Sequence, residues 1–324
     1  MNPSGWLTAI ALAATSGCAL AQAWSPQKNV EIVAASAPGG SNDNTARLLE
    51  RVLTASKLVN ATLTVVNKPG GSGTIAHTYV AQRTGDAHIL GIITSGIVAN
   101  QINGLSTLSV ADFTPIAMLT NDYVVFAVST ASGIRTGKDL VDKLKKDPRS
   151  VSIGVPSAFG TSRHIAAGLL LKSIGGNPRD LKPVVFKGSA EAIPALLGGH
   201  LDLVVVGAGN TVAHVAGGRM RVIAVAAPQR LPGALSHVPT WKEQGVDLAY
   251  GAWRAIMGPR KLTPAQVAYW ENVLRNVTET AEWKADLEKN YWTDDFITGA
   301  QLKKEIDRDY VATKAVLVDL GLAK

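Results

Sequence analysis

An apolar run that stops at two glycines constrains this chain more than any other feature. Val30–Ala34 has the length and β-branched character of a buried strand, and Pro38-Gly39-Gly40 follows it. A helical pattern then begins, with its apolar positions on one face: Ala46, Leu48, Leu49, Val52 and Leu53. Glycines at such a junction let backbone N–H groups approach an anion at the positive end of the new helix. The spacing matches neither a P-loop nor a dinucleotide fingerprint.

Further strand-like runs alternate with helical patterns. After Val30–Ala34 we expect strands at 62–66, 89–94, 124–128, 151–155, 183–186, 203–206 and 222–226. Helices are expected at 43–56, 74–82, 138–146, 161–173 and 189–198. This alternation predicts an α/β fold with a mixed, mostly parallel sheet in each lobe, covered by helices on both faces.

The C-terminal third changes character. Residues 248–258 are expected to form one more extended segment, and Thr263-Pro264 then opens a helix as N-cap and first residue. Further helical patterns follow at 280–289 and 299–320. We therefore expect one lobe from residues 24–124 plus 249–324 and a second lobe from 125–248. The chain would cross between them near 122–125 and 248–253.

The N-terminus reads as a secretory signal peptide covering residues 1–23. An uncharged, alanine-rich stretch at 6–21 leads into Ala21-Gln22-Ala23, an A-x-A-type cleavage site before Trp24. Export to the periplasm follows from this reading; the alternative is a disordered or interfacial N-terminus. Cys18, the only cysteine, would be lost on cleavage. A lipoprotein box at Cys18 ranks second, because Thr15 stands where an aliphatic residue is normal.

The formal charge of +7 lies entirely outside residues 1–23. A basic balance suits anionic partners. No run of more than two Lys or Arg occurs and no aromatic residues interleave with them, so we expect no nucleic-acid partner. Scattered solvated lysines explain most of this charge equally well.

Loops rich in Gly, Ser and Thr follow most of the expected strands. In an open α/β sheet, ligands bind beyond the carboxyl ends of the strands. Backbone N–H groups and neutral hydroxyls there suit a carboxylate. A single loop of this composition is most simply an ordinary turn or helix cap, but five such loops at successive strand ends indicate a binding site. Besides the first loop, the candidate ligand contacts are Gly71, Ser72, Ser95, Gly160, Thr161, His164, Gly188, Ser189 and Gly207.

Enzyme signatures are absent from the sequence. There is no G-x-S-x-G elbow and no pair of histidines three to five residues apart that would suggest zinc. A Ser–His–Asp arrangement assembled in space stays open. His164 in a first helical turn is more often a packing or capping residue than a base. Asp43 and Arg47 at i, i+4 suggest a helix ion pair, and Asp43 can also cap its helix.

The chain resembles the extracytoplasmic solute receptors of tripartite tricarboxylate transporters, also called the Bug or TctC-like receptors. The resemblance covers essentially the whole chain after residue 23, in order. It rests on Ala37-Pro38-Gly39-Gly40-Ser41-Asn42-Asp43, Val66-Asn67-Lys68-Pro69-Gly70-Gly71-Ser72-Gly73, Gly160-Thr161-Ser162-Arg163-His164, Lys187-Gly188-Ser189-Ala190-Glu191, and Val238-Pro239-Thr240-Trp241.

The resemblance implies a two-lobed periplasmic binding protein of type II, the Venus-flytrap arrangement, with its ligand between the lobes. It implies a monomer without enzymatic activity or cofactor, which delivers a small carboxylate to inner-membrane permease subunits. In the family a ligand carboxylate meets the first loop, which here points to Pro38, Gly39, Gly40, Ser41 and Asp43. The facing lobe would offer Gly160, Thr161, His164, Gly188 and Ser189.

Four further positions bear on the choice of ligand and on how it would be held. Asn42 stands where the citrate-binding branch is expected to have an aromatic residue, which argues against citrate; mono-, di- and aromatic carboxylates all fit. Arg163 and Arg254 are candidates for binding a second carboxylate, or are solvated or interlobe charges. Gly40 has two interpretations as well: its missing Cβ admits the carboxylate, or it only supplies a positive φ.

Two other functions stay open. One is a periplasmic hydrolase or transferase with a spatially assembled Ser/His site. The other is a receptor that signals to a membrane sensor, which the sequence does not distinguish from a transport receptor.

We predict that export removes residues 1–23. N-terminal sequencing of the protein recovered from the periplasm is expected to begin near Trp24, because the A-x-A site ends at Ala23. Full-length protein confined to the cytoplasm, or a lipid attached to Cys18, contradicts this prediction.

Overall fold

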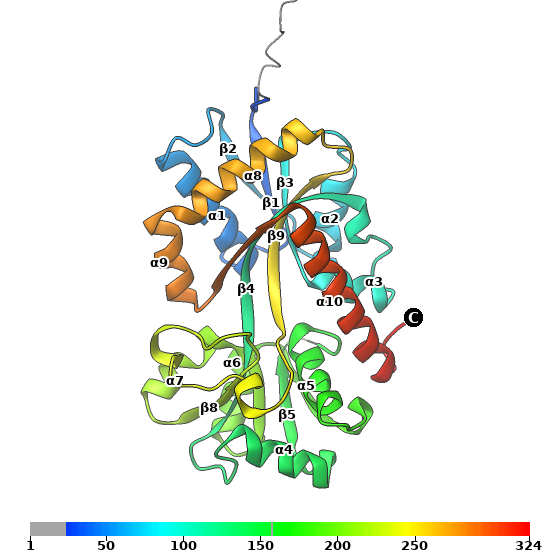
Figure 1. Cartoon of the computed structure of the whole chain (residues 1–324), viewed down its shortest axis with the longest axis vertical. Helices are drawn as coiled ribbons and strands as arrows, with labels where there is room; N and C mark the ends of the chain where they lie inside the picture. The colour runs from blue at the N-terminus through cyan, green and yellow to red at the C-terminus, as the bar shows by residue number, and fades with distance from the viewer. Residues whose placement is uncertain (1–23, 157) are drawn as a thin grey trace, which may run out of the picture.

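The structure, a computed structural model, describes residues 24–156 and 158–324. The expectations for the signal peptide, the cleavage site at Ala23 and Cys18 fall outside these residues. Two α/β lobes lie end to end, and β4 and β9 run lengthwise from the upper lobe toward the lower one (Figure 1).

Strands and helices alternate along most of the chain. The strands are β1 (Val30–Ala34), β2 (Leu63–Asn67), β3 (Ile89–Thr94), β4 (Phe113–Ser129), β5 (Ser152–Pro156), β6 (Lys182–Phe186), β7 (Leu203–Gly207), β8 (Met220–Val225), β9 (Gly251–Pro259) and β10 (Thr293–Thr298). The α-helices are α1 (Ser41–Ala55), α2 (Thr74–Ala81), α3 (Gly96–Ile102), α4 (Gly137–Lys146), α5 (Ser162–Ser173), α6 (Ser189–Leu197), α7 (Val212–Ala216), α8 (Pro264–Glu279), α9 (Ala281–Asn290) and α10 (Gly299–Asp319).

One strand belongs to both sheets. We call lobe 1 the part built on the sheet β2-β1-β3-β9-β4-β10, and lobe 2 the part built on β8-β4-β7-β5-β6. β4 pairs with β9 as far as Tyr123 and with β7 from Val124 onward. The sheets are mixed, as predicted, with parallel pairs among β1, β2 and β3 in lobe 1 and among β5, β6 and β7 in lobe 2. Every antiparallel pair contains β4 or β9, and these outnumber the parallel pairs.

Strand direction determines where the loops of each lobe point. β3 and β4 both run antiparallel to β9, so β1, β2 and β3 run in the same direction as β4, toward lobe 2. β7 runs antiparallel to β4, and β5 and β6 run parallel to β7. The carboxyl ends of β5, β6 and β7 therefore point back toward lobe 1. The loops after both sets of parallel strands face one another.

Most expected elements are present within two residues of their expected bounds, and α3, α7 and β10 were missed. β4 begins at Phe113, well before the expected start at 124, because Thr114, Pro115 and Asn121 hide its apolar character. β10 was missed because its sequence TDDFIT is polar, as suits a strand at the sheet edge. α3 is short, which gives little room for a helical period.

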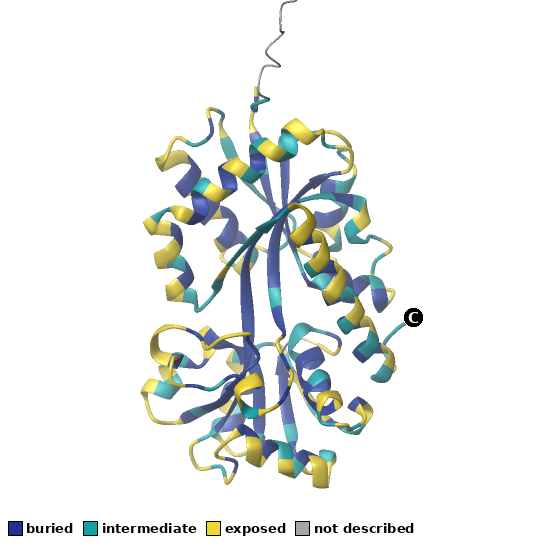
Figure 2. Ribbon diagram, viewed as in Figure 1, coloured by how far each residue is buried: buried dark blue, intermediate teal, exposed yellow. Residues whose placement is uncertain are grey.

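The apolar faces meet where the patterns place them. In Figure 2 the central strands β4 and β9 are mostly dark blue, while the helices show yellow outer faces. In lobe 1, Leu48, Leu49 and Val52 of α1 pack in one core cluster with Trp270 of α8 and Trp283 of α9. This packing fixes α1, and thereby the loop that precedes it, against the sheet.

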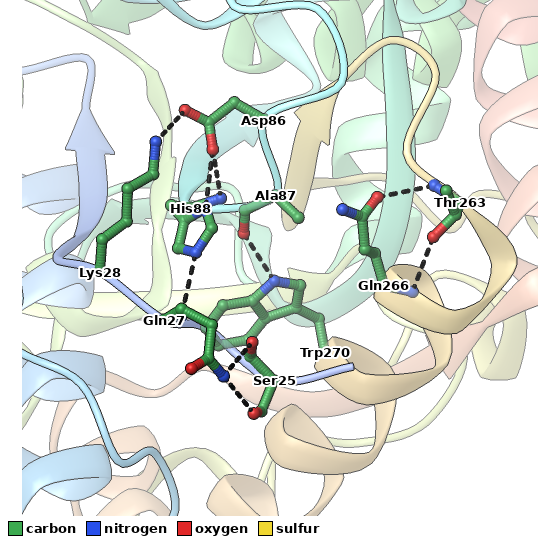
Figure 3. A network of polar contacts seen from close by, with 9 residues as sticks. All are labelled: Ser25, Gln27, Lys28, Asp86, Ala87, His88, Thr263, Gln266 and Trp270. Atoms are coloured by element: carbon green, nitrogen blue, oxygen red, sulfur yellow. Dashed lines mark hydrogen bonds and ion pairs between the residues drawn. The ribbon is translucent and has the colours of Figure 1, made fainter. Parts of the chain in front are cut away.

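Polar contacts fasten the first described residues to the outer end of lobe 1 (Figure 3). The Gln27 N–H donates to Nε2 of His88 at 3.2 Å, and Nδ1 of His88 lies 2.8 Å from the Asp86 carboxylate. Lys28 pairs with the same carboxylate at 3.0 Å. Trp270 donates to the Ala87 carbonyl beside them. The chain thus enters the fold at the end of lobe 1 far from lobe 2.

Helix α10 ties the two lobes together on one side. It packs on α3 in lobe 1 and on α5 in lobe 2, where a Cβ on Gly168 would lie 2.7 Å from Val316. Asp309 of α10 is buried against β9 and accepts a hydrogen bond from the Trp253 indole at 2.8 Å and one from Thr313 at 3.2 Å. Burial raises the pKa of Asp309 to about 6, against these hydrogen bonds, which lower it.

We predict that Asp309→Asn makes the protein less sensitive to pH between 4 and 7.5. The native carboxyl holds a proton up to about pH 6, whereas in the unfolded chain it loses it near 3.8, so the wild type loses stability as pH rises through this window. An amide avoids this loss, which is on the order of 2 kcal/mol. Urea unfolding at both pH values measures it.

Asp307→Asn serves as the matched control, because Asp307 lies on the same helix but is exposed and paired with Lys303. This control is expected to follow the wild-type pH dependence. Parallel pH profiles for Asp309→Asn and the wild type would contradict the prediction.

Candidate functional site

The first loop leaves backbone donors open at the start of α1. Its Gly39 N–H donates to Oδ2 of Asp43 at 2.8 Å, and the Asp43 N–H donates to the Ser36 hydroxyl at 3.0 Å. In the described part of the chain, the Ser41 and Asn42 N–H groups have no hydrogen-bond acceptor. Two free donors at the positive end of a helix favour an anion.

Asp43 orders this loop. It is buried, and its oxygens accept hydrogen bonds from Gly39, from the Asn67 amide at 2.9 Å and from Arg47 at 3.0 Å. Burial raises the pKa of Asp43, but these hydrogen bonds outweigh it and leave the pKa below its usual value. The carboxylate therefore stays ionised at neutral pH and joins the first loop to the end of β2.

The two glycines of the first loop, Gly39 and Gly40, are required for different reasons. Gly39 has φ +80° with open space around its missing side chain, whereas Gly40 has φ −75°. The interpretation that Gly40 supplies a positive φ is wrong; Gly39 does so. A Cβ on Gly40 would lie 2.7 Å from Cβ of Ser36, so this glycine is required by close packing inside the loop.

The other predicted contacts of lobe 1 lie in the neighbouring strand-end loops. Gly71 and Ser72 are exposed in the 3₁₀ turn η1 (Gly71–Gly73), and the Ser72 carbonyl accepts from Asn100 of α3 at 2.9 Å. Ser95 is buried at the start of α3, and its N–H donates to the Trp253 carbonyl of β9. Because β1 pairs with both β2 and β3, these loops and the first loop share one edge of the sheet.

The predicted contacts of lobe 2 form a second group. Gly160 and Thr161 precede α5, Gly188 and Ser189 begin α6, and Gly207 ends β7. Strands β5, β6 and β7 are parallel, so these positions share the edge of the sheet that faces lobe 1. Gly160 approaches lobe 1 closely, since a Cβ there would lie 2.6 Å from the Asn103 amide nitrogen.

His164 is a neutral, buried donor. Its Nδ1 accepts from the Gly160 N–H at 3.0 Å, which places the ring proton on Nε2. Nε2 is buried and finds no partner within the described residues. Burial lowers the pKa of His164 to about 4. The ring thus offers one uncharged N–H.

A charged cluster lies between the two groups of loops, and the sequence indicated it only in part. Arg163 of α5 pairs with Asp122 of β4 at 3.1 Å, just before β4 enters lobe 2. Arg254 of β9 is buried and donates to the Ser41 hydroxyl at 2.6 Å, over the Trp292 ring. Asp122 and Trp292 were missed. The sequence signal that could have identified Asp122 was an acidic residue within a largely apolar segment. No sequence signal identified Trp292.

The described residues offer little for other chemistries. Among them, no hydrogen bond joins a serine hydroxyl to a histidine ring, and no group of three His, Cys, Asp or Glu side chains is placed to hold a metal ion. Within residues 24–156 and 158–324, no helix has both the length and the apolar surface needed to cross a bilayer.

Comparisons with known proteins point to one family. The model of the tripartite tricarboxylate transporter family receptor, TctC, matches residues 46–322. A UPF0065 protein of Bordetella bronchiseptica is 30% identical over 81% of this chain and 76% of its own length. Protein BugT of Bordetella pertussis is 25% identical over 81% of this chain and 79% of its own.

Solved structures share the fold. A TctC solute-binding protein from Polaromonas, solved without ligand, superposes with a TM-score of 0.81 at 24% identity, over 91% of this chain and 99% of its own. An R. palustris protein solved with adipate gives a TM-score of 0.74 at 24% identity, over 92% and 99% of the two chains. The prediction of a two-lobed periplasmic-binding-protein fold is confirmed.

We predict that Gly40→Ala destabilises the protein through Ser36. The new Cβ pushes against the Ser36 side chain and is expected to lower the free energy of unfolding by about 1–3 kcal/mol, the usual cost of overpacking. In a Ser36→Gly background the same substitution is expected to cost clearly less. Urea unfolding of the two single variants and the double variant measures this coupling. Strictly additive losses would exclude it.

Proposed function

Because this chain belongs to the tripartite tricarboxylate transporter receptor family, we propose that it captures a small carboxylate in the periplasm and presents it to the inner-membrane permease subunits of such a transporter. The proposal includes export, with cleavage near Ala23, and a monomeric receptor without catalytic activity.

The observation that carries this proposal is the first loop. Its free Ser41 and Asn42 N–H groups lie at the start of α1, beside the loops after β2 and β3. Such donors favour an anion at the start of the helix. The uncharged His164 N–H and the loops before α5 and α6 supply neutral donors from lobe 2.

The ligand class is a mono-, di- or tricarboxylate, aromatic acids included. Relatives of similar fold have been solved with adipate and with malate. Both are small dicarboxylates of different length, so these neighbours support the class of ligand without selecting one acid for this chain.

We propose that the lobes close on the ligand by a hinge. The lobes comprise residues 24–124 plus 249–324 and residues 125–248, and the hinge lies where β4 passes from β9 to β7. Hinge closure around a ligand takes place at a few loop or element-terminal residues that absorb the change in backbone angles.

We predict that a carboxylic acid raises the melting temperature of the protein and is recovered unchanged. At a concentration about 100 times Kd, the ligand adds about 2.7 kcal/mol to stability. A thermal-shift screen of C2–C8 mono- and dicarboxylates and aromatic acids measures this, with the matching primary amides as controls. Chromatography of the incubated acids and of their esters reports any turnover.

Small-angle scattering on the same samples is expected to show a smaller radius of gyration with saturating acid. Ester hydrolysis that depends on His164 would support the hydrolase alternative instead. No shift with any acid of the screen would overturn the proposed function.

A further inference from the structure

Arg254 is a deeply buried cation next to the first loop. It lies on β9, opposite Thr94 of β3 and Thr120 of β4, and it is only 6% exposed. Nη2 donates to the Ser41 hydroxyl at 2.6 Å, and the guanidinium lies 4.0 Å from the centre of the Trp292 ring. The strand and these two contacts place the guanidinium beside the N-terminus of α1.

Most of this guanidinium has no partner. Nε and Nη1 are both buried and find no hydrogen-bond acceptor within the described residues, and no carboxylate there lies within 4 Å of Arg254. A guanidinium carries five N–H donors, and the Ser41 hydroxyl accepts only one of them. Trp292 covers a face of the group but accepts none of the remaining in-plane hydrogen bonds.

The neighbouring charges do not compensate Arg254. Asp122 and Arg163 are the charges that act on its pKa, and they are already paired with each other at 3.1 Å. Burial lowers the pKa of Arg254 to about 10, which still leaves it protonated at neutral pH. The three side chains together carry one uncompensated positive charge. A buried cation without a counterion is unfavourable, and one carboxylate would balance it.

We infer that Arg254 is the ion-pair anchor for one carboxylate group of the ligand. The inference rests on the proposed function and deepens it, because it makes the negative charge of that group a requirement for binding. The Nη2–Ser41 bond places the guanidinium beside the free Ser41 and Asn42 N–H groups, so one carboxylate meets both. A planar carboxylate matches the fork of a guanidinium, whereas an amide or ester lacks the charge.

The test compares Arg254→Met and Arg254→Lys with Arg275→Met. Arg275 is a suitable control because it also lies over an aromatic ring, that of Phe296, but is exposed. The probes are C2–C8 mono- and dicarboxylates, including adipate and malate, and their primary amides. Thermal shift selects the acids that bind the wild type, and calorimetry gives their Kd.

For acids that bind the wild type, Arg254→Met is expected to raise Kd by about a hundredfold or more, as the loss of two charge-assisted hydrogen bonds implies. Arg254→Lys keeps the charge without the fork and is expected to fall between Arg254→Met and the wild type, and Arg275→Met to bind as the wild type does. The amides are expected not to bind the wild type. A Kd within about threefold of wild type for Arg254→Met would overturn the inference while leaving the proposed function intact.

The ligand-free proteins give an independent readout. Arg254→Met removes an uncompensated buried cation, so its melting temperature is expected to equal or exceed that of the wild type. If the melting temperature of Arg254→Met falls clearly more than that of Arg275→Met, Arg254 supports the fold. That outcome overturns the inference even if no acid in the panel binds. Absence of binding to the wild type by every acid of the panel overturns the proposed function and, with it, the carboxylate anchor assigned to Arg254, whereas acid binding that Arg254→Met leaves intact overturns the anchor alone.

Discussion

The pairing of β4 with β9 is the constraint on which the rest of this molecule depends. The two strands stay paired from Phe113 opposite Pro259 to Tyr123 opposite Gly251, and β4 then continues into the sheet of lobe 2. This pairing sets the opposed directions of the parallel strands in the two lobes. Consequently, loops that are separated by up to about half the chain face one another across the place where β4 passes from β9 to β7, which we call the joint.

The joint itself is unusually polar for a buried strand. Thr120, Asn121 and Asp122 interrupt the apolar side chains of β4, and a Cβ on Gly251 would lie 2.2 Å from the Asn121 amide oxygen. Glycine at 251 is therefore what lets β9 stay paired beside Asn121. Helix α10 packs on both lobes at one side of this joint. The lobes also meet at a second place, where the turn η5 (Ala208–Asn210) after β7 packs on α9 and Tyr291 packs against the core cluster of lobe 2.

Patterns of consecutive residues predicted those parts of the structure that depend on residues nearby in the sequence. The run Val30–Ala34, the glycines after it and the apolar face of α1 are contiguous, and they were sufficient to locate the first loop. The contact between Ser41 and Arg254 joins residues 213 positions apart, and the position of Trp292 depends on how α9 packs. No periodicity encodes such contacts. The sequence also did not predict that Gly39 supplies the positive φ while Gly40 is required by close packing, because that packing depends on where Ser36 lies.

The charges around the first loop explain why binding a carboxylate there would need Arg254, which is distant in the sequence. Asp43 is held ionised in the first turn of α1, where the helix dipole favours a negative charge. A ligand carboxylate at the Ser41 and Asn42 N–H groups would therefore arrive next to an existing anion and be repelled. Arg47, paired with Asp43 at 3.0 Å, offsets that anion. In the role that we infer for it, Arg254, which contacts the Ser41 hydroxyl, supplies the charge that a second anion needs at the same helix end.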